Sequence, residues 1–369
     1  MKKLFILSSL IIVAVYLLAW PVEIEPVAWK APDNPGYTGS FTKNQALSQI
    51  HRLELNGEIG PEDVAIDASG MPVFGVLGGD IMRLNSNGEY ESLVNTGGRP
   101  LGIEYDTQGN LWIADAYIGL LKLTPEGNLE TVLTHVGDSP IRYADDLDIT
   151  ASGKVYLSDA STKFHAKHYG TYAASLLDIN EHGGHGRVIE YDTNTKQAMV
   201  ILDGLNFANG VAVSHDEEWV LVNETAKYRV LKIGIAEHNR QHQQVVIDNL
   251  PSFPDNINPG SNSLYWVGLV SPRSAPLDAL SEYPYLRKVV QRLPAFMRPK
   301  AKHYGHLIAI NDQGKVVHDL QDPLGMYGHV TGAAEAGEVL YVSSLHETAL
   351  GKTVNLNQSK QTLIEPQTP

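Results

Sequence analysis

Short polar clusters precede several apolar runs of this chain, and their side chains are the ones best suited to chemistry. Glu62, Asp145, Asn209, Asp255 and Asn256 belong to these clusters and supply three carboxylates and two amides. Such hard oxygen donors are the ligands that Ca²⁺ takes in proteins. The set holds no thiolate, thioether or imidazole, so it does not suit zinc or copper. The clusters are Gly60-Pro61-Glu62-Asp63, Tyr143-Ala144-Asp145-Asp146, Phe207-Ala208-Asn209-Gly210 and Phe253-Pro254-Asp255-Asn256.

Asp and Asn are also frequent in turns, so a single cluster of this kind would say little about function. Four clusters stand at matching positions, however, before strands that otherwise differ in sequence. This register favours a shared calcium site over four unrelated turns. A repeated structural element must then bring the four clusters together.

The stretch 99–132 contains the unit that the rest of the chain repeats. It predicts four short strands, at 101–105, 111–115, 119–123 and 129–132, because runs rich in Leu, Ile, Val, Trp and Tyr alternate with D-x-x-G and P-E-G turns. The spacing of an amphipathic helix is absent from it. Its first hairpin recurs at 62–76, 145–159, 209–224, 255–268 and, more loosely, 329–344.

Six copies of a four-stranded unit predict an all-β fold, a six-bladed β-propeller, because one such sheet cannot bury both of its faces alone. A two-sheet sandwich is the alternative, but the repeats favour the propeller. The innermost strand of each propeller blade lines a central channel. The polar clusters at the starts of these strands should therefore surround one mouth of the channel.

Composition narrows the class of protein further. The chain has 369 residues, and we expect 56–369 to form one propeller domain. There is no Cys, which excludes disulfides, a thiol nucleophile and Cys-ligated zinc. The net charge of −14 and the lack of a basic recognition motif argue against nucleic acid as a partner.

The N-terminal segment 1–22 predicts a membrane anchor. Lys2 and Lys3 precede an almost unbroken apolar run from Leu4 to Val22, which is near the length that spans a bilayer as a helix. The run ends in Leu-Leu-Ala-Trp-Pro, a poor cleavage site, so an uncleaved anchor is favoured over a signal peptide. The lysines would keep that end cytoplasmic and place the propeller on the exported side, periplasmic or extracellular; cleavage would make it secreted. Residues 23–55 are expected to form a linker.

Two insertions interrupt the repeats, at 161–185 and 271–303. The second holds seven Lys and Arg against two Asp and Glu, and its apolar spacing predicts a short amphipathic helix at 278–294. This helix could be a lid over one end of the propeller, and it could also touch anionic lipid. The first insertion carries four His without a metal-binding spacing.

The order of several motifs resembles the strictosidine synthase-like proteins, in particular the adipocyte plasma membrane-associated branch, which also has an N-terminal anchor. The similarity covers about 57–345 and rests on GPEDVAID, GRPLGIEYDTQGNLWIADAYIGLLKL, YADDLDI, GRVIEYD, LNFANGVAVS, LPSFPDNI and LYWVG. The wider superfamily includes paraoxonases and gluconolactonases, six-bladed propellers with calcium in the channel. The resemblance maps their calcium ligands onto Glu62, Asp145, Asn209, Asp255 and Asn256. Those relatives usually have Asn where this chain has Asp145, a change that keeps an oxygen ligand.

The resemblance implies hydrolysis of a lactone or aryl ester, with calcium polarising the carbonyl and a base activating water. Paraoxonases use a His after the second strand of blade two, where this chain has Asp115, so a carboxylate would have to act as base. His346 and His329 are further catalytic candidates, together with Asp159 and Glu224. In the region of the strictosidine synthase glutamate, this chain offers only Glu335, which its sequence predicts to lie in a turn, and this argues against alkaloid synthesis.

Two hypotheses follow from the sequence. The first is a membrane-anchored, calcium-dependent hydrolase of small lactones or aryl esters. The second is a non-catalytic propeller in which calcium is structural and one face binds a partner or lipid. The sequence does not name the substrate.

Overall fold

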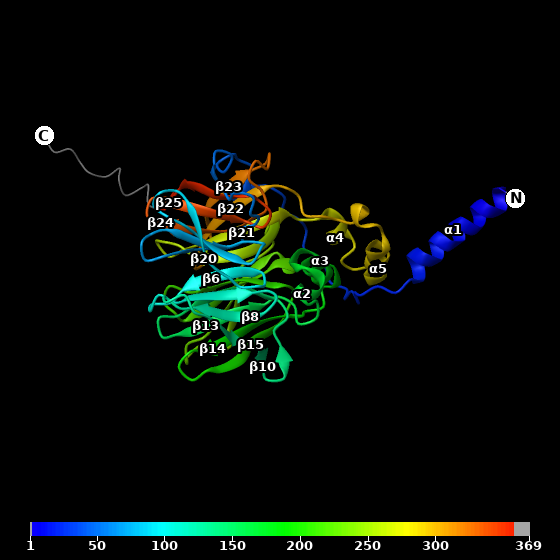
Figure 1. Ribbon diagram of the computed structural model, residues 1–369. Coiled ribbons are helices and arrows are strands. Elements are labelled where there is room, and N and C mark those ends of the chain that lie inside the picture. Colours follow the sequence, from blue (N-terminus) through cyan, green and yellow to red (C-terminus); the bar gives the residue numbers. More distant parts are fainter. Residues whose placement is uncertain (1, 358–369) are drawn as a thin grey trace.

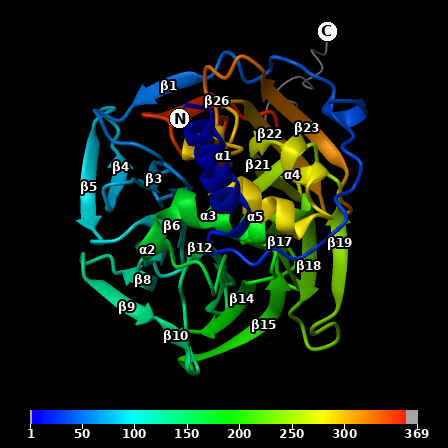
Figure 2. The ribbon, with the colours of Figure 1, turned by 90° about the vertical axis from the view of Figure 1, so that its right-hand side faces the viewer.

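Six four-stranded antiparallel sheets surround a central axis in the structure, a computed structural model that describes residues 2–357 (Figures 1 and 2). The predicted all-β, six-bladed propeller is confirmed. The first three blades follow chain order from the innermost strand outwards. Blade 1 consists of β2 (Val64–Ile66), β3 (Pro72–Gly75), β4 (Asp80–Leu84) and β5 (Tyr90–Asn95); blade 2 of β6 (Pro100–Tyr105), β7 (Leu111–Asp115), β8 (Gly119–Leu123) and β9 (Leu129–Leu133); blade 3 of β12 (Ala144–Ile149), β13 (Lys154–Asp159), β14 (Gly186–Asp192) and β15 (Gln197–Leu205).

The remaining blades follow the same plan, and the last one joins the two ends of the propeller. Blade 4 consists of β16 (Ala208–Val213), β17 (Trp219–Glu224), β18 (Arg229–Gly234) and β19 (Gln243–Ile247); blade 5 of β20 (Ser252–Pro259), β21 (Leu264–Pro272), β22 (Gly305–Asn311) and β23 (Val316–Asp322); blade 6 of β24 (Val330–Ala336), β25 (Val339–Ser344), β26 (Ala349–Val354) and β1 (His51–Glu54). A small hairpin, β10 (His135–Val136) with β11 (Ser139–Pro140), follows blade 2.

Strand β1 corrects the expected linker 23–55. It pairs antiparallel with β26, from His51 opposite Lys352 to Glu54 opposite Ala349, and so supplies the outermost strand of blade 6. Residues upstream of β1 are also bound to the propeller, since the Val27 amide donates to the Glu181 carbonyl at 2.9 Å and the Trp29 amide to the Ser281 carbonyl at 3.1 Å. Only the partner strand makes this short polar segment extended, which is why its sequence alone did not reveal it.

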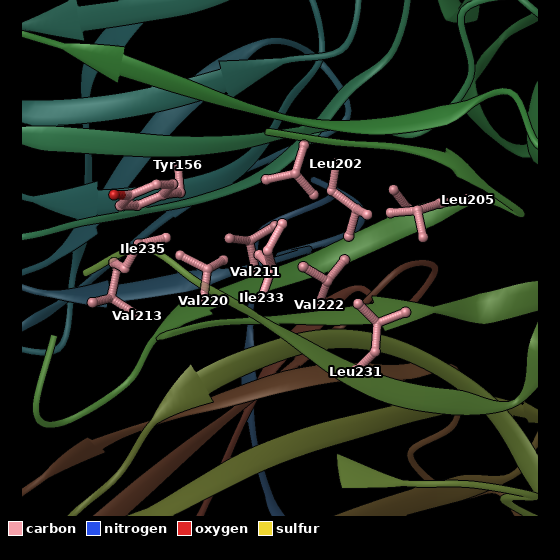
Figure 3. Close-up of a cluster of buried hydrophobic side chains, with 12 residues drawn as sticks. Tyr156, Leu202, Leu205, Val211, Val213, Val220, Val222, Leu231, Ile233 and Ile235 are labelled. Atoms are coloured by element: carbon pink, nitrogen blue, oxygen red, sulfur yellow. The ribbon is translucent and has the colours of Figure 1, made fainter. Parts of the chain in front are cut away.

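The hydrophobic core lies between neighbouring blades. Inner strands are buried on both faces, as in β7, whereas the outermost strand β9 has no buried residue and exposes Glu130 and Thr131. Figure 3 shows the layer between blades 3 and 4, a single cluster of buried side chains in which Tyr156 lies beside Val213 and Ile235. Each blade thus buries the face that it could not bury alone.

Both insertions form helices on one face of the propeller (Figures 1 and 2). The first contains α2 (Ala166–Tyr169) and α3 (Thr171–Glu181), which its histidines did not indicate. The second contains α4 (Ala275–Ala279), α5 (Pro284–Arg292) and the 3₁₀ turn η3 (Ala295–Met297) in place of one helix at 278–294. Pro284 separates the two helices because a proline lacks the N–H and disfavours a helical conformation at the residue before it.

The N-terminal helix α1 (Lys2–Ala19) extends away from the propeller on the side of α3, α4 and α5 (Figure 1). None of its residues is buried. Within the described residues it is the one helix long and apolar enough to cross a membrane. A further 3₁₀ turn, η1 (Gly39–Phe41), lies between α1 and β1, and η2 (Thr225–Lys227) follows β17.

Candidate metal centre

At the start of nearly every innermost strand, its pairing with the second strand of the blade shifts in register. This shift turns the side chains of the polar clusters towards the central axis. The pairing with the second strand is interrupted between Ala144 and Leu147, between Ala208 and Val211, and between Pro254 and Ile257. These interruptions contain Asp145, Asn209, Asp255 and Asn256. A bulge leaves residues unpaired and redirects their side chains. The side chains of these four ligand candidates therefore need not alternate between the two faces of the sheet.

Glycine permits the inner strands to approach one another closely at this level. A Cβ on Gly210 of blade 4 would lie 2.5 Å from the Asp255 carbonyl oxygen of blade 5. A Cβ on Gly102 of blade 2 would lie 2.4 Å from Oδ1 of Asp146 in blade 3. Any larger residue would push adjacent blades apart and separate the side chains that meet at the channel mouth.

The predicted ligands converge at the bottom of a cavity of about 550 Å³. Glu62, Asp145, Asn209 and Asp255 line it directly. Asn256 is buried beside them, where its Nδ2 donates to the Glu62 carbonyl oxygen at 3.0 Å and to Oε1 of Glu62 at 3.3 Å. The Asn209 amide nitrogen donates to Oδ1 of Asp255. Blades 1, 3, 4 and 5 therefore each contribute at least one oxygen donor to one place.

Four of these side chains each keep one buried oxygen without a hydrogen-bond partner. The oxygens are Oε2 of Glu62, Oδ2 of Asp145, Oδ1 of Asn209 and Oδ1 of Asn256. A buried acceptor without a donor costs about 1–3 kcal/mol, so four in one site call for a ligand. The donor set fits Ca²⁺, which takes six to eight oxygens including water.

Histidine and acidic side chains do not form the site alone. Within residues 2–357, no group of three or more His, Asp or Glu side chains is arranged so that it could hold a metal ion. The candidate site therefore includes the buried, unpartnered amide oxygens of Asn209 and Asn256.

Burial and mutual repulsion oppose ionisation of the three carboxyl groups. The pKa of Glu62 and that of Asp145 are raised well above their ordinary values, first by burial and then by the charges of neighbouring carboxylates, Asp255 foremost. Burial raises the pKa of Asp255 to about 7. A bound divalent cation would reverse this balance, because it offsets the negative charge that the carboxylates impose on one another.

Arg99 is a component of the site that sequence reasoning missed. Its side chain is 1 % exposed, and its Nη1 reaches the Gly60 carbonyl oxygen at 3.5 Å. Burial lowers the pKa of Arg99, while the charge of Glu62 acts in the opposite direction. When all groups are ionised, Arg99 and the three carboxylates carry a net charge of −2, which matches a divalent cation. In the sequence, only the place of this arginine just before the second repeat could have drawn attention to it.

The walls of the cavity are largely apolar. Leu101, Tyr143, Phe207 and Phe253 surround the polar floor, and the helical insertions form the outer part of the cavity. The insertions contribute Tyr172, Leu176 and Ile179 of α3 together with Leu277, Leu280 and Val290 around α4 and α5. The cavity thus combines a polar floor with walls suited to a small organic molecule.

Asp115 does not line this cavity, and its carboxylate is occupied by other groups. Oδ1 accepts the Arg99 and Tyr117 amides, each at 3.0 Å, and Oδ2 accepts the Thr96 hydroxyl at 2.7 Å. Its side chain is fully buried. The expectation that Asp115 acts as the base therefore conflicts with its hydrogen bonds and its position.

Asp159 and Glu224 hold the same position in blades 3 and 4 as Asp115 does in blade 2. Asp159 accepts the Tyr143 amide at 2.9 Å and pairs with Arg187, and Glu224 accepts the Asn206 amide at 2.9 Å and pairs with Arg229. Each carboxylate thus fixes the loop that leads into an innermost strand. Glu335 lies in β24 and accepts from the Trp266 indole at 2.7 Å, so it too is engaged outside the cavity.

His329 and His346 form a cluster with His303 beside the cavity. Their ring centroids lie 5.0 Å apart for His303 and His329 and 5.2 Å apart for His329 and His346. Burial, with the charges of the other two histidines, lowers the pKa of His329 to about 4. His346 contacts the ring of Tyr172, a residue of the cavity wall, at 5.3 Å between centroids. Of the predicted catalytic residues, His346 is thus in contact with the wall.

Comparison with known proteins gives consistent relationships. Residues 145–238 match the family model "Strictosidine synthase", and 39–84 match "Strictosidine synthase-like, N-terminal". The chain is 34% identical over 359 residues to the adipocyte plasma membrane-associated protein of Bos taurus, covering 90% of this chain and 82% of that protein. It is 34% identical over 304 residues to the Arabidopsis thaliana protein strictosidine synthase-like 10, covering 74% and 79% of the two chains.

Solved structures share the fold at low sequence identity. A gluconolactonase from Xanthomonas campestris superposes with a TM-score of 0.60 at 13% identity, covering 89% of this chain and 97% of that one. Regucalcin from Agrobacterium tumefaciens, described as a calcium-binding protein, gives a TM-score of 0.58 at 13% identity, covering 82% and 92%. At these identities, the likeness establishes the propeller fold.

Proposed function

The chain belongs to the strictosidine synthase-like family that includes the adipocyte plasma membrane-associated proteins, and from this membership and the site geometry we propose that it is a calcium-dependent hydrolase of small lactones or aryl esters. The gluconolactonase and regucalcin that share its fold agree with a hydrolase and with calcium, respectively. The bond to be hydrolysed would be an ester within a small organic molecule.

One observation carries the proposal. Glu62, Asp145, Asn209 and Asn256 each present a buried oxygen without a partner, at the floor of a cavity with apolar walls. A structural cation enclosed by its ligands would not need this cavity. A substrate carbonyl entering the cavity would reach the level of the ligands, so the same oxygens can serve a catalytic ion.

The residues of this chain have distinct parts in the proposed reaction. Bound calcium would supply a Lewis acid for the carbonyl and for the charge that develops on its oxygen. Leu101, Phe207 and Phe253 exclude water from the apolar part of the substrate. His346 does not line the cavity itself, but its ring contacts Tyr172 of the wall, and this makes it the candidate to accept a proton from the attacking water. Burial, reinforced by the charge of Arg99, lowers the pKa of His346 and keeps its imidazole neutral near pH 7.

The membrane assignment is part of the same proposal. Helix α1 would anchor the chain, with Lys2 and Lys3 on the cytoplasmic side and the propeller on the exported side. The relative from Bos taurus is named for its association with the plasma membrane.

A non-catalytic propeller stabilised by calcium is the second candidate. The ligand candidates come from blades 1, 3, 4 and 5, so a cation there would connect elements that otherwise meet only through their inner strands. That connection would raise the free energy of unfolding whether or not a substrate binds.

Hydrolysis of phenyl acetate and of a series of lactones by the full-length chain in detergent separates the two candidates. We expect turnover with calcium, loss of turnover with chelator, and loss in Asp255→Asn. Asp203→Asn is the matched control, because Asp203 is exposed on β15, the outermost strand of blade 3, and does not line the cavity. Absence of turnover across the panel, with a melting temperature that still rises with calcium, would reject the hydrolase and favour the structural role.

A further inference from the structure

Helix α5 of the second insertion binds the C-terminal end of α1. Nη1 of Arg292 donates to the Leu17 carbonyl oxygen at 2.9 Å, and its Nε donates to the Trp20 carbonyl oxygen. The Tyr285 hydroxyl donates to the Leu18 carbonyl oxygen at 2.7 Å. The last carbonyls of a helix have no partner within it, so these two residues satisfy groups that lipid could not. The positive charge of Arg292 also complements the negative end of the helix dipole.

The surface next to this junction is apolar. Phe296 is 79% exposed and Met297 55% exposed in η3, and Tyr283 and Leu286 are exposed around α5. Large apolar side chains gathered on one exposed face mark an interaction surface. We refer to this face, formed by Tyr283, Tyr285, Leu286, Phe296 and Met297, as the lid surface.

Basic residues accompany the lid surface. Lys288, Arg298, Lys300 and Lys302 belong to the same insertion. Arg273 is paired with Asp278, but none of those four cations takes part in a salt bridge among the residues that the structure describes. Arg298, Lys300 and Lys302 also line the cavity. Exposed aromatic and aliphatic side chains in a segment that also carries cations outside salt bridges are typical of a segment that lies in a membrane interface.

The arrangement of the helices places the lid surface beside the membrane. Figures 1 and 2 show α1 leaving the propeller on the face that carries α3 and α5, in front of the central channel. The outer wall of the cavity includes Leu280, Val290 and Arg298 from the same insertion. If α1 crosses a bilayer, the lid surface reaches the leaflet where α1 emerges.

We propose that the insertion 271–303 is a membrane-docking surface, which binds a phospholipid leaflet containing anionic lipid and holds the cavity against it. Arg292 and Tyr285 fix the angle at which α1 enters the propeller, so the lid surface and α1 contact the same leaflet. This interaction does not depend on calcium or on the proposed hydrolysis. In the docked state, the outer part of the cavity faces the bilayer instead of bulk water.

The absence of Cys in the chain permits a direct test by site-specific labelling. The full-length chain, reconstituted in vesicles of phosphatidylcholine with phosphatidylglycerol, would carry an environment-sensitive fluorophore at Phe296→Cys. Val245→Cys is the matched control, because Val245 is an exposed apolar residue on the outer strand β19. We expect nitroxide-labelled lipid to quench the probe at 296, and aqueous iodide to quench the probe at 245.

Two outcomes would overturn the proposal. Equal access of iodide to both probes would show that the lid surface faces water. Protection of the probe at 296 from iodide without quenching by lipid would show that protein, such as a second copy of this chain, covers it.

Charge reversal tests the electrostatic part of the proposal. A basic residue near an anionic leaflet contributes about 1 kcal/mol, or about fivefold in the docking equilibrium. We expect Lys288→Glu with Lys300→Glu to reduce lipid quenching at 296 in anionic vesicles, and Lys196→Glu, on an exposed turn of blade 3, to leave it unchanged. Equal lipid quenching in the labelled parent protein, the double variant and the Lys196→Glu control would contradict a role for Lys288 and Lys300.

Discussion

The amide of Asn256 in blade 5 donates to both the main chain and the carboxylate of Glu62 in blade 1, at 3.0 and 3.3 Å. This contact uses the nitrogen of Asn256 and one oxygen of Glu62, and leaves Oδ1 of Asn256 and Oε2 of Glu62 without partners. The two residues therefore orient each other and expose one oxygen each to the candidate metal. A leucine at 256 would remove both effects.

Calcium should stabilise the protein through these oxygens. At about a hundredfold its dissociation constant, a ligand raises the free energy of unfolding by about 2.7 kcal/mol. We expect Asn256→Leu and Asn209→Leu to abolish the rise in melting temperature on adding calcium to the chelated protein. Asn128→Leu, in an exposed turn, is the control. A full calcium response in Asn209→Leu would contradict the site.

His346 should act in the chemical step and not in calcium binding. Loss of a general base lowers the rate by about 10²–10⁴-fold, so we expect His346→Gln to reduce kcat in that range with an unchanged calcium-dependent melting temperature. The lowered pKa of His346 predicts that the acid limb of the kcat/KM profile of the unsubstituted protein lies below pH 6.5. His238→Gln, exposed on the surface, should retain full activity. Wild-type turnover by His346→Gln would exclude His346 as the base.

Asp115 should matter for stability. Replacing it with Ala leaves the buried amide of Arg99 and the partly buried amide of Tyr117 without an acceptor, at a cost of about 1–3 kcal/mol for an unsatisfied buried group. We expect urea denaturation to show lower stability for Asp115→Ala, and kcat per folded molecule to stay near the wild-type value. A large fall in kcat with unchanged stability would restore Asp115 as a catalytic candidate.

Arg99 should balance the carboxylates in the absence of calcium. The charge of Arg99 opposes the rise in pKa of Glu62 and Asp145, so Arg99→Met should lower the melting temperature in chelator. Because a more negative site attracts a cation more strongly, calcium should raise that temperature more than it does in the wild type. Arg187→Met is a matched control, since it breaks a buried pair with Asp159 in blade 3. Equal calcium responses in the two variants would show that Arg99 acts only as a structural residue.

Glu104 should make the stability of the chelated protein depend on pH. Burial, with the charge of Asp148, raises the pKa of Glu104 from 4.5 to about 8, so the folded state holds a proton that the unfolded state releases. The stabilisation is therefore complete below about pH 4.5 and is lost as pH rises towards 8. We expect Glu104→Gln to reduce the fall in melting temperature between pH 5 and 8.

A second variant serves as the control for the pH dependence of the melting temperature. Glu237→Gln, in an exposed loop, should keep the wild-type dependence on pH. An identical fall in melting temperature for Glu104→Gln and the wild type would show that Glu104 does not carry the effect.

Several features could be predicted from the sequence because the fold repeats them. Turn residues and apolar runs recur in each blade, so the number of sheets and their strands followed from local patterns. The ligand candidates Glu62, Asp145, Asn209 and Asp255 stand at one register of that repeat, and a propeller brings equal registers together at its axis. Their convergence was therefore open to prediction without any knowledge of side-chain geometry.

The position of Asp115 within the repeat was not enough to predict its role. The end of the second strand in blades 2, 3 and 4 carries Asp115, Asp159 and Glu224, and only their hydrogen bonds show that each fixes the loop before an innermost strand. A carboxylate that accepts buried amides and one that accepts a proton from water look the same in a sequence. Their partners distinguish them.

The features that the sequence did not predict depend on contacts between distant parts of the chain. Strand β1 is extended because β26 offers it a free edge, Arg99 lies among carboxylates of other blades, and Arg292 reaches the end of α1 at Leu17. Local sequence determines which segments form strands and helices through turn propensity and hydrophobic period. It carries no comparable signal for pairs hundreds of residues apart, whose contact depends on how all six blades close around the axis.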